Sequence, residues 1–159
     1  MRSEWNGSGH GAGGSFPFGV LVIVLMTGCS PTSGQVAGQD VFARYCALCH
    51  QPDGVGVPGA FPPLTDSEWA QGDEGRLIRL VLNGMQGPIT VHGQEYNNVM
   101  TPHAFLTDEQ IANVLTYVRS SFGNDAGPVS VEQVARVRET NTQEGLWLVS
   151  ELEGTVGID

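Results

Sequence analysis

The sequence predicts a small all-α fold, and three observations support that prediction. Apolar residues recur at helical spacing in the segments 37–50, 74–83 and 108–122. Residues that cap helix N-termini stand directly before two of these segments. Runs rich in glycine and proline separate the segments, and such runs interrupt regular structure. We therefore expect one domain of three to five helices over residues 36–125, with a C-terminal extension over residues 126–159.

The first half of this domain is predicted to contain three helices. The segment AGQDVFARYCALCH, residues 37–50, carries its apolar side chains on one helical stripe. The run QPDGVGVPGAFPPL that follows predicts a loop. A capping box of Thr65 and Glu68 predicts a short helix bearing Trp69. Asp73 caps a third helix, EGRLIRLVLN, which ends at the following glycine.

The second half is predicted to form a hairpin, a loop and a final helix. ITVHGQEY alternates weakly around His92 and Gly93 and predicts a small β-hairpin. NNVMTPHAF predicts an irregular loop around Met100. Thr107 and Gln110 form a second capping box at the start of the last helix, which is predicted to end at the glycine after Phe122. The apolar stripe of that helix consists of Ile111, Val114, Leu115, Val118 and Phe122.

Contacts between the first and last helices, and the course of the extension, can also be predicted. We expect Gly38, Phe42 and Tyr117 to form the helix–helix contact, because glycine permits close approach. In the extension, a cap at Ser130 predicts a short helix over VEQVARVRE. The sequence leaves open whether Trp147 docks on the domain, contacts a partner or stays mobile.

The pentapeptide C-A-L-C-H, residues 46–50, fits three chemistries to different degrees. A structural zinc site would require a second pair of ligands at similar spacing, and the chain has only one further cysteine. A dithiol oxidoreductase would place C-x-x-C inside a βαβ unit, and no such unit surrounds this motif. Covalent haem attachment needs only the pentapeptide, because each thiol adds to a vinyl group and His50 ligates the iron. The motif therefore favours one covalently attached haem c.

The amino-terminal region resembles a bacterial lipoprotein signal. Residues 16–26 form an apolar run shorter than the roughly 20 residues that a membrane-spanning helix needs. The small residues that follow lead to Cys29, so we expect residues 1–28 to be a signal peptide, Cys29 to carry lipid and residues 29–35 to be a tether. An ordinary signal cleaved elsewhere, or a retained anchor, is the alternative interpretation.

The charge of the chain excludes one class of partner. The sequence has 7 basic and 17 acidic residues, a net charge of −10, and it contains no lysine. Nucleic-acid binding requires clustered lysine and arginine side chains that contact phosphates, so no nucleic-acid partner is expected. Acidity of this size steers the protein towards positively charged partner surfaces.

Taken in order along residues 36–125, the motifs resemble those of a class I c-type cytochrome. They are an amino-terminal helix with Gly38 and Phe42, C-A-L-C-H, a P-P-L loop, a methionine loop, and a last helix with an aromatic residue. The stretch from FPPL to NNVM is similar to cytochrome domains fused to copper nitrite reductases or found beside membrane-bound oxidases and dehydrogenases. The resemblance implies the cytochrome c fold, with helices around one covalent haem and a hairpin before the distal loop.

The resemblance also implies roles for residues on the proximal side of that haem. Cys46 and Cys49 would form the thioether bonds, and His50 would be the proximal ligand of the iron. Pro62 would offer its carbonyl oxygen to the second nitrogen of that imidazole, which fixes the tautomer of the ring. Leu64 would pack against the haem face.

On the distal side, the resemblance assigns the sixth ligand to Met100, which precedes the capped last helix. Met85, His103, His92 or an open position are the alternatives, with Met85 expected to be a core residue. Family members usually carry proline directly after the ligand, whereas this chain has a threonine there. Tyr96 is a candidate donor to the haem or to the ligating sulfur.

The function that the resemblance implies is electron transfer. A His/Met-ligated iron has both axial positions filled and carries single electrons. We expect an exported, periplasm-facing membrane lipoprotein that shuttles electrons between respiratory redox proteins; which membrane holds it is left open. A fixed haem subunit of a dehydrogenase, oxidase or nitrite reductase complex is the alternative. A peroxidase-like enzyme would require Met100 to leave the iron.

Overall fold

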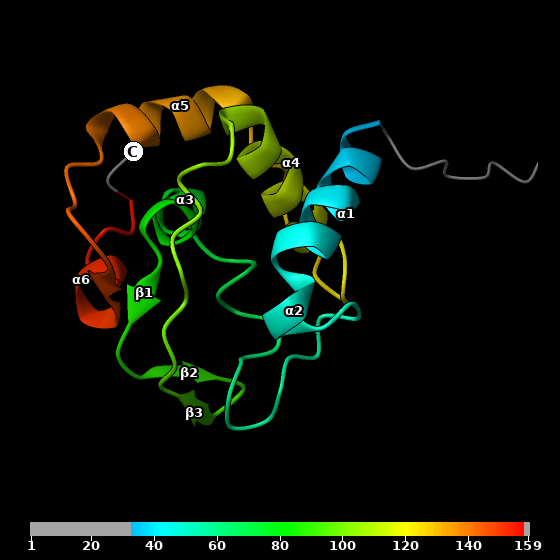
Figure 1. Ribbon diagram of the computed structural model, residues 1–159, viewed down its shortest axis with the longest axis vertical. Coiled ribbons are helices and arrows are strands. Elements are labelled where there is room, and N and C mark those ends of the chain that lie inside the picture. Colours follow the sequence, from blue (N-terminus) through cyan, green and yellow to red (C-terminus); the bar gives the residue numbers. More distant parts are fainter. Residues whose placement is uncertain (1–32, 158–159) are drawn as a thin grey trace, which may run out of the picture. The chain divides into compact units, whose positions relative to one another are not determined.

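The computed structural model describes residues 33–157, and it is mostly helical (Figure 1). The predicted all-α class is confirmed, although two of the six helices within these residues span five residues or fewer. No helix within this range has the length and hydropathy needed to cross a membrane. The helices are α1 (Ser33–Tyr45), α2 (Ala47–His50), α3 (Glu74–Asn83), α4 (Asp108–Arg119), α5 (Val131–Thr140) and α6 (Val149–Glu153). The strands are β1 (Met85–Gln86), β2 (Ile89–Val91), β3 (Gln94–Tyr96) and β4 (Trp147–Leu148).

The predicted signal peptide, residues 1–28, and the predicted lipid site, Cys29, lie outside the described residues. The first described helix, α1, starts at Ser33. Residues 33–35 therefore belong to a helix, although the sequence predicts them as the end of a tether.

Helices α1 and α4 cross at Gly38, as the sequence predicts. A β-carbon added to Gly38 would lie 2.2 Å from the backbone oxygen of Asn113, so only glycine permits this crossing. The Phe42 ring lies 5.6 Å from that of Tyr117 and 5.1 Å from that of Phe122, measured between centroids. These contacts fix the position of the segment that runs into the C-A-L-C-H motif.

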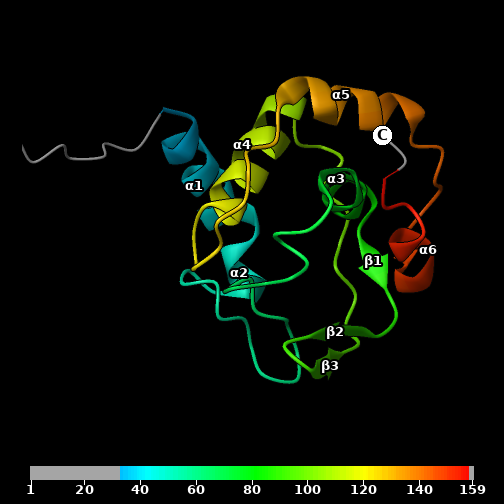
Figure 2. The same cartoon turned by 180° about the vertical axis from the view of Figure 1, so that it is seen from behind.

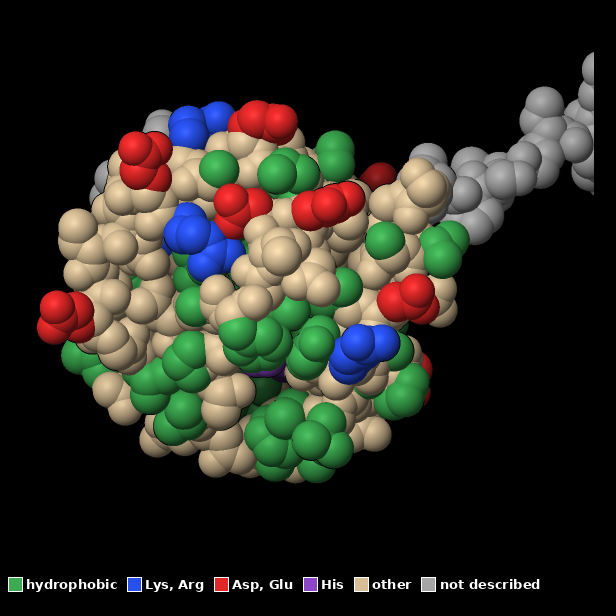
Figure 3. All heavy atoms as spheres, turned by 45° about the horizontal axis from the view of Figure 1, so that its top comes forward, with side chains coloured by type: hydrophobic (Ala, Val, Ile, Leu, Met, Phe, Trp, Pro, Cys, Tyr) green, Lys and Arg blue, Asp and Glu red, His purple; other side chains and the backbone are tan. Residues whose placement is uncertain are grey.

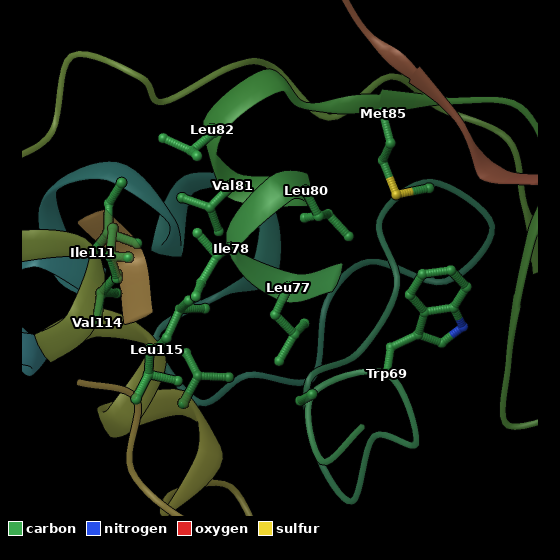
Figure 4. Close-up of a cluster of buried hydrophobic side chains, with 14 of the residues drawn as sticks. Trp69, Leu77, Ile78, Leu80, Val81, Leu82, Met85, Ile111, Val114 and Leu115 are labelled. Carbon is green, nitrogen blue, oxygen red and sulfur yellow. The ribbon is translucent and has the colours of Figure 1, made fainter. Parts of the chain in front are cut away.

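Helix α3 is the central element of the core. It starts where the sequence predicts, because the Asp73 side chain accepts a hydrogen bond of 2.7 Å from the Arg76 backbone N–H. It ends at Gly84, whose φ of +68° favours glycine. Figure 4 shows Leu77, Ile78 and Val81 of this helix beside side chains of α4. The buried α4 residues labelled there are Ile111, Val114 and Leu115.

The short helix predicted at Thr65 is wrong, because residues 65–72 form turns. Asp66 has a φ of +44°, which no α-helix contains. The backbone N–H of the buried Ser67 donates to Asn124 Oδ1 at 3.0 Å, and Asn124 also donates to the Leu64 carbonyl oxygen at 2.8 Å. These long-range bonds replace the local bonds of a capping box, and nothing in the local sequence reveals them.

The last helix of the domain, α4, starts at the predicted capping box of Thr107 and Gln110, but it ends earlier than predicted. The helix stops at Arg119, and Phe122 lies in the following turn with a φ of +58°. The hydroxyl of Ser120 donates to the Thr116 carbonyl oxygen at 2.8 Å, a local bond that competes with helix propagation. The turn brings the Phe122 ring back onto α1 and α4.

The hairpin and the extension complete the fold. Strands β2 and β3 are antiparallel, and the turn residues His92 and Gly93 both have positive φ, so the predicted hairpin is confirmed. Helix α5 starts at Val131, directly after the predicted cap Ser130. Trp147 docks on the domain, because β4 pairs in parallel with β1, Trp147 opposite Met85. Figure 2 shows α5 lying over α3 and α4, and α6 beside β1.

Candidate functional site

A deep apolar pocket lies between α2, α3, α4, the hairpin and two loops, residues 51–73 and 97–107. Figure 3 shows a hollow in the surface, with a histidine side chain inside it and hydrophobic side chains around its mouth. Its apolar lining includes Phe42, Leu64, Trp69, Leu77, Val81, Met85, Val91, Leu106, Val114 and Val118. Such a pocket suits a large, flat, mostly apolar group.

The proximal wall of the pocket comes from the C-A-L-C-H motif and the loop after it. Cys46, Cys49 and His50 all line the pocket. His50 Nδ1 lies 3.0 Å from the Pro62 carbonyl oxygen, the partner that the resemblance assigns to it. Because that bond uses Nδ1, the other ring nitrogen is free to bind a metal. Leu64 lines the same wall.

The loop after the motif holds Pro62 in place through backbone bonds. The Gly56 N–H donates to the His50 carbonyl oxygen at 2.9 Å, and the Leu64 N–H donates to the Gly54 carbonyl oxygen at 2.7 Å. A β-carbon on Gly56 would lie 2.3 Å from the Phe61 carbonyl oxygen. The tight loop therefore needs glycine there. The folded loop places the Pro62 carbonyl oxygen against His50 Nδ1 and so fixes the orientation of the imidazole.

The electrostatics of this wall favour a neutral imidazole and oppose a reactive dithiol. Burial lowers the pKa of His50, against the raising effect of its bond to Pro62, and the charge of His103 lowers it further. The neutral form is the one that ligates metals. Burial and the adjacent Cys49 raise the pKa of the Cys46 thiol to about 11. Thiols that exchange disulfides have a lowered pKa instead, so this pair is not arranged for that chemistry.

The distal wall comes from the loop around Met100. Met100 and Met85 form an isolated antiparallel bridge, with N–H to carbonyl oxygen distances of 3.1 and 3.0 Å, and both residues line the pocket. Met85 is buried, as expected for a core residue, and it also lines the pocket. In Figure 4 its sulfur faces the ring of Trp69.

Three further polar residues predicted near the site have different positions. Tyr96 is buried, lines the pocket and lies opposite Ile89 in the hairpin. His103 lines the pocket, and its buried Nδ1 has no hydrogen-bond partner within residues 33–157. His92 is exposed at the hairpin tip, where Nε2 lies 3.2 Å from the Asp66 carbonyl oxygen, and it does not line the pocket.

Two contacts around the pocket were not predicted from the sequence. Asn98 joins the two walls, because its Nδ2 donates to the Ala60 carbonyl oxygen at 2.9 Å. The sequence predicts Trp69 on a short helix, whereas its buried ring lines the pocket. Arg76 lies over that ring, with its guanidinium carbon 4.1 Å from the centroid. No local pattern marks these contacts, since each joins separate segments of the chain.

Haem c fits this pocket on the residues present. Two thiols and an imidazole at C-x-x-C-H spacing lie in one wall, and a thioether side chain lies in the loop that forms another wall. The rest of the lining is mainly apolar, as the macrocycle requires. When bound, haem c supplies an iron that takes up and releases one electron at a time. The fold and the pocket thus define a helical protein with one covalently attached haem.

Comparisons with known proteins identify the family. The family model described as cytochrome c matches residues 35–122. Cytochrome c-552 of Thermus thermophilus is 41% identical over 113 residues, which cover 65% of this chain and 86% of that protein. The chain therefore belongs to the cytochrome c family, and it carries covalently bound haem c.

Longer relatives carry a similar domain as one part of their chain. The cytochrome c subunit of a quinone-dependent alcohol dehydrogenase from Gluconacetobacter polyoxogenes is 31% identical over 115 residues, 70% of this chain but 24% of that subunit. A subunit of a cbb3-type cytochrome c oxidase from Rubrivivax gelatinosus is 33% identical over 95 residues, 60% of this chain and 28% of the subunit. Family members carry electrons by themselves or as subunits of oxidoreductase complexes, and this protein is an electron-transfer cytochrome with redox proteins as partners.

Proposed function

We propose that the protein is a single-haem electron carrier whose iron is ligated by His50 and Met100. The observation that carries the proposal is the arrangement of the pocket: His50 is fixed by Pro62 in one wall, and Met100 is fixed by its backbone bridge to Met85 in another. An iron with both axial positions filled by protein exchanges electrons and has no free position for a substrate. Compared with a second nitrogen ligand, a thioether raises the reduction potential.

Met100 is favoured over the other candidates by its position in the loop before the capped last helix, where the family pattern places the ligand. This loop contains no helix or strand, so the bridge to Met85 sets the direction of the Met100 side chain. The alternative Met85 is buried at 4% exposure, and its sulfur faces the ring of Trp69. His103 has a backbone bond of 2.9 Å to the Val81 carbonyl oxygen, and its ring lies against Phe105, 5.7 Å between centroids.

We also propose that electrons enter and leave at the apolar mouth of the pocket. Leu48, between the two cysteines, is 88% exposed, and Phe105 is 65% exposed. The Phe105 ring contacts Tyr45 and His103, both of which line the pocket, with the Tyr45 ring 5.3 Å away. Exposed apolar side chains beside the pocket favour brief contacts with a partner's apolar surface.

The location and the partners complete the proposal. We place the protein on the periplasmic face of a membrane, held by lipid on Cys29, because a lipoprotein-like signal precedes a motif whose haem is attached outside the cytoplasm in bacteria. In that position it carries electrons between respiratory proteins. The dehydrogenase and oxidase subunits among its relatives support the second candidate, a fixed haem subunit of such a complex.

The axial ligands are tested by comparing two methionine variants. A Met-ligated oxidised protein shows a weak sulfur-to-iron absorption band in the far red. Met100→Ala is expected to abolish the band and to open the iron to cyanide, whereas Met85→Ala keeps the band. His103→Ala tests the remaining candidate in the pocket in the same way and is expected to keep the band. If the band survives in Met100→Ala and disappears in Met85→Ala, the ligand assignment is wrong.

A further inference from the structure

The C-terminal extension is joined to the Met100 loop at two places, directly through Arg138 and indirectly through strand β1. At the far end of the loop, Arg138 of α5 donates three hydrogen bonds. Its Nη1 donates to the Ala104 carbonyl oxygen at 3.0 Å, and its Nη2 donates to the Leu106 carbonyl oxygen at 2.8 Å. Its Nε bonds to Asp108 Oδ1 at 2.7 Å. One guanidinium group thus joins the extension to the end of the loop and the start of α4.

At the near end of the loop, strand β1 lies between the loop and the extension. The Trp147 N–H donates to the Gly84 carbonyl oxygen at 3.2 Å, while Met85 bonds to Met100 on its other edge. A β-carbon on Gly84 would lie 2.2 Å from the Met100 carbonyl oxygen and 2.9 Å from Leu146 Cδ2. The backbone of residue 84 is therefore in close contact with both segments at once.

A side chain from the end of α3 secures this arrangement. Asn83 Nδ2 donates to the carbonyl oxygens of Gln143 and Gly145, at 3.0 and 3.2 Å. Asn83 Oδ1 accepts a hydrogen bond from Asn141. The segment between α5 and β4 is thereby bonded to the residue that immediately precedes the Gly84 crossing.

We propose that the C-terminal extension, residues 126–157, is a positioning element that holds the Met100 loop in the geometry needed for iron ligation. The inference rests on the proposed function, in which Met100 is the sixth ligand. A thioether is an uncharged ligand, so its hold on the iron depends on how little the loop must be reordered to present it. The side chains of the loop are mostly exposed, so buried contacts do little to hold it. Hydrogen bonds to an ionised guanidinium are stronger than those between neutral groups, so the bonds of Arg138 contribute more to its position. Arg138 is the positioning residue with the most contacts to the loop.

The test compares Arg138→Ala with Arg136→Ala in the haem-loaded protein. Both variants remove one arginine from α5, but Arg136 is exposed, whereas Arg138 is half-buried and bonds to the end of the loop. Two quantities are measured: the amide hydrogen exchange of Met85 and Met100, and the rate at which cyanide displaces the distal ligand. For Arg138→Ala we expect each to rise about tenfold, with unchanged exchange in α1, because the opening is local. Arg136→Ala should stay within about twofold of the parent protein.

Several outcomes separate this inference from the ligand assignment. Exchange that rises equally in α1 and at Met100, or that does not change at Met100, overturns the positioning role. Arg138→Lys, which keeps the charge but not the fork of donors, should fall between the other two variants. If Arg138→Ala does not fold, Asn83→Ala replaces it with the same expectation. If the parent protein lacks the sulfur-to-iron band, the ligand assignment fails, and the exchange data still decide whether the extension holds the loop.

Discussion

The two walls of the haem pocket are built in different ways. On the proximal side, Cys46, Cys49 and His50 lie within five residues, and His50 reaches its partner Pro62 across 12 positions. On the distal side, the Met100 loop has no regular structure of its own, and β1, α5 and β4 together hold it. The chemistry of the proximal wall is therefore a property of one short segment, whereas that of the distal wall depends on the whole domain.

The difference shows why mutations elsewhere in the chain should affect the two iron ligands differently. A change far from the motif leaves the spacing of the attachment residues unchanged, since that spacing is set within five residues of the chain. A change in the extension or in α3 alters the distal loop without touching the ligand. The following predictions test this contrast, starting with the largest expected effect.

Removal of both attachment thiols should have the largest effect. In a Cys46→Ala, Cys49→Ala double variant, no thioether bond can form, so extraction with acid and acetone should remove all of the haem. The parent protein should retain its colour through the same treatment, measured by absorbance of the precipitate. Retention of haem by the double variant would contradict the assignment of these two cysteines.

On the distal side, Gly84→Ala should have the next largest effect, with Gly93→Ala as its matched control. Both glycines have positive φ, +68° and +74°, so alanine costs about 1–2 kcal/mol of backbone strain at either position. At Gly93 the new methyl group meets nothing within 4 Å, whereas at Gly84 it overlaps the Met100 carbonyl oxygen. We expect the far-red band to weaken or vanish in Gly84→Ala alone, together with a loss of stability about 2 kcal/mol larger than that of the control. Equal spectra in the two variants would show that the loop tolerates displacement.

This contrast also explains how much could be predicted from the sequence. The attachment motif, the caps at Asp73 and Thr107 and the His92–Gly93 hairpin depend on neighbouring residues, and the structure contains them where predicted. The short helix predicted at Thr65 is absent, because Asn124, far along the chain, takes the hydrogen bonds. Local patterns carry no record of such partners.

Within the site, the same limit applies. The docking of Trp147 beside β1 was left open for this reason, since Trp147 pairs with a segment some 60 positions earlier. The assignment of Met100 came from its place before the last helix in the family pattern. The contacts of the loop with α5 and β1 could not be read from that pattern, because they are tertiary.

A smaller effect is expected at two exposed apolar side chains beside the pocket: Leu48, between the attachment cysteines, and Phe105, against the pocket residues Tyr45 and His103. Phe105→Ser on the distal rim and Leu48→Ser on the proximal rim should each slow electron exchange with a redox partner by about fivefold, equivalent to about 1 kcal/mol. Val156→Ser, an equally simple change at a residue that is 52% exposed in the C-terminal turn, should have no effect. Stopped-flow mixing at fixed ionic strength measures all three. If only one rim variant slows exchange, the partner contacts one wall.

The smallest effect should come from salt. The net charge of −10 attracts a basic partner over a distance that screening shortens to roughly 8 Å at physiological ionic strength. Exchange with a basic redox protein should slow as salt rises, whereas an acidic one should show a flat or inverted response. A stopped-flow salt series with both partners decides this. Faster exchange with the acidic partner at low salt would show that local arginines, not the net charge, govern the encounter.

The separation of contacts along the chain has a consequence for the order in which the molecule is completed. The hydrogen bond of His50 to Pro62 spans only 12 positions, so it can form early in folding. The bond from Asn83 to Gln143 spans 60 positions and requires almost the full chain. Chains acquire structure from the amino terminus first, and distant contacts form slowly. The bonds of the proximal side are thus mostly local in the chain, whereas the distal side is complete only when the last helices have packed onto it.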